Sequence, residues 1–80
     1  MVQRMKRPVL GAEDGATFHG RVVPVDGQFR AKCWAELALP TSHQAEEERC
    51  RICDTQLDAE YWIHEQAIAR GFERYSLSRE

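Results

Sequence analysis

Two cysteines with the spacing Cys50-x-x-Cys53 are the first residues of this 80-residue chain whose types suggest chemistry. This is zinc-knuckle spacing, and His43 lies upstream of the pair. A structural zinc site usually needs four ligands, and the sequence has no second close pair. If residues 50–53 form a strand, the two sulfurs point to opposite faces of a sheet and cannot share one ion. We therefore expect no metal and no cofactor, with Cys50, Cys53 and His43 as weak metal candidates.

Signs of catalysis are equally sparse in the sequence. His64-Glu65 begins like the His-Glu-x-x-His helix of metalloproteases, but Ile68 stands where the second histidine belongs. The chain has no phosphate-binding glycine loop, no dinucleotide fingerprint and no recognisable pair of nucleophile and base. So short a chain also leaves little volume for a pocket of the roughly 300 Å³ typical of ligand sites. We expect a protein that is not an enzyme.

Basic and aromatic side chains are the third chemical feature. Lys and Arg neutralise nucleic-acid phosphates, and a Trp ring offers a surface on which a base or sugar packs. The residues that we predict to bind nucleic acid are Arg21, Arg30, Lys32, Trp34, Arg49 and Arg51. Whether they act together depends on the elements that carry them.

The order of those elements predicts an α+β fold, βββα. Strand-favouring residues occupy about 17–25, 28–39 and 48–54, and Asp26-Gly27 is typical of the tight turn between two antiparallel strands. Thr55 is placed to cap a helix over about 56–70, which Gly71 ends. We expect a three-stranded antiparallel sheet packed on this helix, with a flexible arm over 1–16, one domain over 17–75 and a tail over 76–80.

Alternation along the strands predicts one apolar and one basic face of the sheet. In the third strand, Cys50 and Ile52 would point to the core, and Arg49, Arg51 and Cys53 would point outward. The other predicted core positions are Phe18, Gly20, Val22, Phe29, Ala31, Cys33, Ala35, Leu37 and Leu39. The basic face would then carry His19 together with the six residues predicted to bind nucleic acid.

The helix carries two apolar stripes. Ala59, Ile63 and Ala67 form one, with Trp62 at its edge, and Leu57, Tyr61 and Ile68 form the other. One stripe must cover the sheet. The other needs the arm, the segment around Phe72 and Tyr75, or a second subunit. Leu57, Tyr61 and Ile68 are therefore our candidate interface for a homodimer or a protein partner.

Short segments of the chain resemble known DNA-binding domains. Phe18-His19-Gly20-Arg21-Val22, Gly27-Gln28-Phe29-Arg30-Ala31 and the helix start at Thr55 are similar to the plant Apetala-type (ethylene-responsive) domain. The order of elements also resembles the N-terminal domains of phage-type integrases and small bacterial domains of uncharacterised role. The resemblance implies that Arg and Trp on the exposed sheet face contact bases and phosphates. A sheet can sit in the major groove, where Arg reads guanine. His19 and Arg51-Ile52-Cys53 depart from the plant pattern.

Charge and composition limit the partners. The net charge is −2, which argues against a general polyanion binder, but residues 1–35 carry +3 and residues 36–80 carry −5. No apolar run approaches the ~20 residues that span a bilayer, and the basic N-terminus lacks a signal peptide's apolar stretch. We expect a cytoplasmic, non-enzymatic binding module with no membrane partner. It would contact nucleic acid through the basic face or, alternatively, act as a protein-interaction or homodimeric domain.

Overall fold

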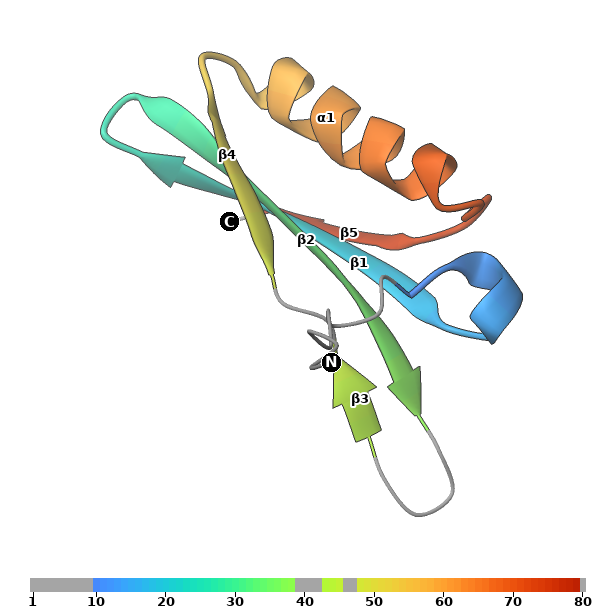
Figure 1. Cartoon of the computed structure of the whole chain (residues 1–80). Helices are drawn as coiled ribbons and strands as arrows, with labels where there is room; N and C mark the ends of the chain where they lie inside the picture. The colour runs from blue at the N-terminus through green and yellow to red at the C-terminus, as the bar shows by residue number, and fades with distance from the viewer. Residues whose placement is uncertain (1–9, 39–42, 46–47, 80) are drawn as a thin grey trace, which may run out of the picture.

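A computed structural model describes residues 10–38, 43–45 and 48–79. It confirms an α+β fold with a C-terminal helix on one side of a sheet (Figure 1). The described elements are the 3-10 helix η1 (Ala12–Asp14), β1 (Thr17–Val25), β2 (Gln28–Ala38), β3 (His43–Ala45), β4 (Arg49–Cys53), α1 (Gln56–Ala69) and β5 (Ser76–Arg79).

The sheet is mixed, whereas the sequence analysis predicted three antiparallel strands. β2 pairs antiparallel with β1 along one edge, and along its other edge with β4 and with the short strand β3. β5 lies beside β1 and runs parallel to it. Two of these strands were not predicted. In particular, residues 76–79 of the expected tail form β5 instead, because the backbone of β1 offers its free edge to them.

Local signals set the ends of the main elements as predicted. Asp26 and Gly27 have φ angles of 50° and 79°, which close the β1–β2 hairpin. The Thr55 hydroxyl accepts a hydrogen bond from the Asp58 amide at 3.0 Å and caps α1. Gly71, with φ of 83°, ends the helix in the left-handed conformation.

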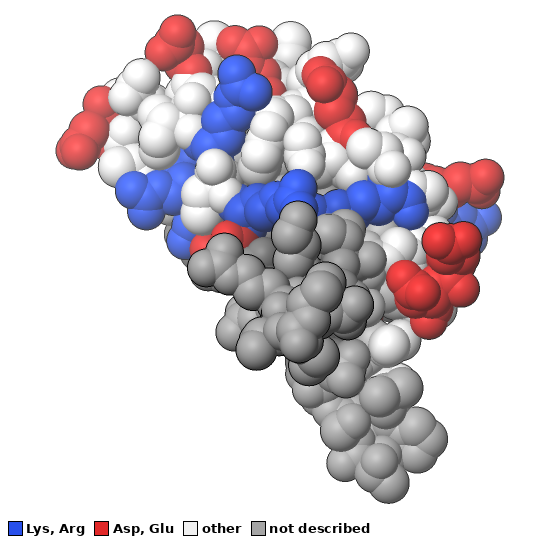
Figure 2. Space-filling model, viewed as in Figure 1, with Lys and Arg blue, Asp and Glu red and all other residues white. Residues whose placement is uncertain are grey.

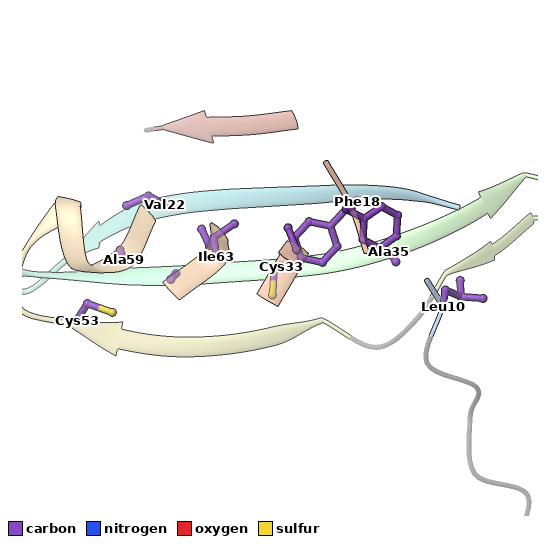
Figure 3. Close-up of a cluster of buried hydrophobic side chains, with 11 residues drawn as sticks. Leu10, Phe18, Val22, Cys33, Ala35, Cys53, Ala59 and Ile63 are labelled. Carbon is purple, nitrogen blue, oxygen red and sulfur yellow. The ribbon is translucent and has the colours of Figure 1, made fainter. Parts of the chain in front are cut away.

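The core lies between α1 and the facing side of the sheet. Ala59, Ile63 and Ala67 are fully buried, so of the two stripes it is this one that docks on the sheet. In Figure 3, Ile63 lies between Val22 and Phe18 along the sheet. The remaining buried hydrophobic residues are Leu10, Ala31, Cys33, Ala35, Cys53 and Phe72.

Part of the predicted arm belongs to this core. Leu10 is buried, and the Ala12 amide donates a hydrogen bond to the Arg70 carbonyl at 3.1 Å. This contact attaches η1 to the end of α1. Residues 1–9 lie outside the described residues, as does the predicted core residue Leu39.

The predicted register of the third strand was wrong. Cys53 lies opposite Phe29 and is buried, whereas Cys50 and Ile52 are exposed. This strand has apolar side chains at both even and odd positions, so alternation alone cannot say which set faces the core. A shift by one residue moves every side chain to the other face.

Candidate nucleic-acid interface

The sheet face that points away from α1 brings together three of the predicted cationic residues. Arg21 lies directly opposite Lys32 in the β1–β2 ladder, and Arg30 follows two residues from Lys32 on the same face. Arg21 is exposed, and the other two are half-buried. Like charges that face each other across a ladder are destabilising, and the Glu48 carboxylate, 3.9 Å from Lys32 Nζ, offsets part of that repulsion. We call this surface the outer face.

Arg49 and Arg51 do not lie on the outer face, which corrects the sequence analysis. They lie opposite Cys33 and Ala31, so they share the helix side of the sheet with the core. Both remain exposed at the edge strand β4. Arg51 lines a shallow hollow of about 240 Å³ between β4 and α1, together with Tyr61 and Trp62.

The cations are therefore divided between the two faces of the sheet. In the view of Figure 2, where β4 is in the foreground, Lys and Arg side chains form a broken band across the middle of the molecule. Acidic side chains border this band. The net charge of −2 thus hides local basic surface, as the sequence analysis inferred, but that surface is not confined to one face.

An aromatic pair adjoins the cations on the outer face. His19 and Trp34 are opposite each other in the ladder, and their rings stack with centroids 5.6 Å apart. The Trp34 indole N–H donates a hydrogen bond to Glu36 at 2.7 Å. On the other side, His19 Nδ1 lies 2.6 Å from the Ser76 hydroxyl of β5. These contacts fix the orientation of both rings.

Ser76 and His19 are also a nucleophile and a base in contact, which the sequence did not reveal. Sites of the Ser-His-Asp type need a carboxylate bonded to the second ring nitrogen. Glu36 lies 3.7 Å from His19 Nε2, outside hydrogen-bonding distance, while the Thr17 hydroxyl lies 3.2 Å from that nitrogen. The geometry therefore favours a structural role for His19, in which it holds the aromatic pair in place.

The cysteines do not converge on a metal site in the described part of the chain, which holds no group of three or more metal-ligating residues. Cys50 is exposed and Cys53 buried, so the two thiols point to opposite faces of β4. Desolvation raises the pKa of the Cys50 thiol, as do its hydrogen bond to Glu48 and the charge of that carboxylate. A raised pKa lowers the fraction of the thiolate, which is the reactive form of cysteine. The side chain of His43 lies outside the described residues.

The second stripe of α1 is open to solvent. Leu57, Tyr61 and Ile68 are 77%, 63% and 55% exposed, and no described element covers them. His64 lies on the same side of the helix and contacts the Tyr75 hydroxyl at 3.0 Å.

Ser76 is the site residue that the sequence analysis missed. The segment Ser76–Arg79 carries one apolar residue, so it has no strand pattern of its own. Its only sequence signal is the alternation of serines around Leu77.

Comparisons of the chain with models of protein families, with curated proteins and with solved structures give no match. They do not bear on the resemblance to the plant Apetala-type and integrase domains, which stays a prediction. None of the described helices is long and apolar enough to span a membrane.

Proposed function

We propose that this chain is a small, non-enzymatic binding module of the cytoplasm that contacts nucleic acid through its outer face. The observation that carries the proposal is the position of Arg21, Arg30 and Lys32 on two adjacent strands, next to Trp34. No described helix covers this face, since α1 packs on the opposite side of the sheet. Arg49 and Arg51 belong to a neighbouring surface and supply at most a secondary contribution.

The proposal predicts a salt-dependent affinity. Each phosphate contact contributes about 0.7–0.9 to the slope of log K against log salt concentration, so three cations predict a slope of about −2 to −3. Binding of labelled single-stranded and duplex oligonucleotides would be measured by fluorescence anisotropy between about 50 and 200 mM salt. Absence of binding to both forms at the lowest salt would overturn the proposal.

A matched pair of variants locates the surface. Arg30→Ala should weaken binding and reduce the salt slope by about 0.7–0.9, because it removes one phosphate contact. Arg51→Ala removes the same charge from the other side of the sheet and should leave the slope nearly unchanged. Equal effects of the two variants would contradict the assignment to the outer face.

A second candidate function rests on the exposed stripe of α1. The exposure of Leu57, Tyr61 and Ile68 favours a protein-interaction or homodimeric domain. Large apolar side chains that gather on one exposed side of a helix often mark a site of protein contact. Association through this stripe would persist in high salt, unlike binding through the outer face.

A further inference from the structure

We infer that the nucleic acid bound by the outer face is single-stranded, and that it lies along β2 with one base at the His19–Trp34 pair. The inference rests on the proposed function and names its ligand class. Three observations carry it: the width of the sheet, the order of side chains along β2 and the fixed orientation of the aromatic pair.

The sheet is too wide to enter the major groove. At Arg21 and Lys32 the register places β4, β2, β1 and β5 side by side. Three spacings of about 4.8 Å separate the outer two backbones by about 14 Å, before side chains are counted. The major groove of B-DNA is about 12 Å wide and admits a helix or a two-stranded ribbon. Insertion of the sheet into the major groove, which the sequence analysis considered, is therefore disfavoured because β5 makes the sheet wider.

Along β2 the outer face presents two cations followed by an aromatic ring. Arg30, Lys32 and Trp34 occur at every second residue, so they span about 13–14 Å along the strand. Cations that follow a phosphate backbone, with aromatic rings for the bases, are the recurring arrangement in single-strand binding. A duplex keeps its bases stacked inside the helix and leaves the ring without a base.

The aromatic pair is already held in place before a ligand arrives. Trp34 is fixed by its hydrogen bond to Glu36 and by the stacked ring of His19. His19 is in turn fixed by Ser76 of β5. Side chains that are already ordered lose less entropy on binding. The strand β5 thus both widens the sheet and orients the surface on which a base would stack.

The test compares three ligands at about 50 mM salt: unpaired oligonucleotides of about ten thymidines or ten uridines, and a hairpin duplex of similar length. We expect an unpaired oligonucleotide to bind more tightly than the duplex, and the tighter of the two identifies DNA or RNA as the ligand. Trp34→Ala should weaken single-strand binding by about fivefold to a hundredfold, the loss expected for one stacked base. Tyr61→Ala, on the exposed side of α1, is the aromatic control and should bind like the wild type.

The wild-type protein provides a second measurement that does not depend on a variant's folding. The indole N–H signals of Trp34 and Trp62 report on opposite sides of the sheet, and in an NMR titration only that of Trp34 should shift with the unpaired oligonucleotide. Binding to the duplex as tightly as to the single strands would overturn this inference and leave the proposed function standing. Absence of binding to all three ligands would overturn both. A shift confined to Trp62 would place the ligand on the wrong face.

Discussion

Gly20 shows how a single small residue sets the distance between the helix and the sheet. A Cβ atom at this position would lie 2.5 Å from Cγ2 of Ile63, far closer than two carbons can approach. Ile63 is fully buried and β-branched, so it has little freedom to move aside. The absence of a side chain at Gly20 therefore lets α1 pack directly against β1.

We predict that Gly20→Ala lowers the free energy of unfolding by about 1–3 kcal/mol, the usual effect of overpacking a filled core. Urea denaturation followed by circular dichroism would measure the loss. Ile63→Ala in the same chain removes the clashing methyl group, so the two changes together should cost less than the sum of the single changes. Strict additivity would show that Gly20 and Ile63 do not compete for the same space.

At the scale of elements, the short strand β5 is held by more than its ladder with β1. Arg79 donates two hydrogen bonds to Glu60 of α1, at 2.6 and 3.2 Å, and Gln56 donates a third at 2.9 Å. This cluster attaches the end of β5 to the first half of the helix. The hydrogen bonds from Arg79 and, to a smaller extent, from Gln56 lower the pKa of the Glu60 carboxyl.

A pH dependence follows from this lowered pKa. A carboxyl whose pKa is lower in the folded state stabilises the fold above its unfolded value of about 4.3, and that stabilisation disappears as the pH falls through the folded value. We expect Glu60→Gln to lower stability slightly at pH 7, since the Arg79 side chain is 59% exposed, and the difference from the wild type to shrink as the pH falls below about 4.3. Thermal unfolding at pH 7 and at a series of lower pH values would measure this. Glu65→Gln on the same helix is the control. If it lowered stability at pH 7 as much as Glu60→Gln does, the contact between Glu60 and Arg79 would not be the source of the effect.

The strands and the helix differ in how well the sequence predicts them. β1, β2 and α1 were predicted to within about a residue, because Asp26-Gly27, Thr55 and Gly71 mark their ends locally. β4 was found as a strand, but with the wrong face inward, because apolar side chains occur at both parities. β5 was missed because its pairing partner is more than 50 residues away in the sequence and it buries little of its own surface.

At the scale of the whole molecule, the described elements leave both the outer face and the second stripe of α1 uncovered. The outer face is cationic, and the second stripe of α1 is apolar, so their interactions respond differently to salt. If the second stripe of α1 is an interface between two copies of the chain, sedimentation velocity should show a concentration-dependent dimer that persists at high salt. Leu57→Ser with Ile68→Ser should raise its dissociation constant about tenfold or more, because each change removes apolar contact area.

A chain that sediments as a monomer at all concentrations, with and without these substitutions, would rule out the second stripe of α1 as an interface between copies. The outer face remains intact in the double variant, so nucleic-acid binding should be unchanged. Loss of nucleic-acid binding in that variant would instead link the two surfaces.

The sequence by itself determined the α+β class, the main hairpin and the capped helix with its two apolar stripes. These features depend on local turn and cap chemistry and on side-chain periodicity, both of which are read within a few residues. Only the tertiary structure decided the register of β4, the parallel pairing of β5 and the contact between His19 and Ser76. They depend on backbone hydrogen bonds between distant segments, which leave almost no trace in the residue pattern. The same pairings separated Arg49 and Arg51 from Arg21, Arg30 and Lys32, and so changed the candidate interface.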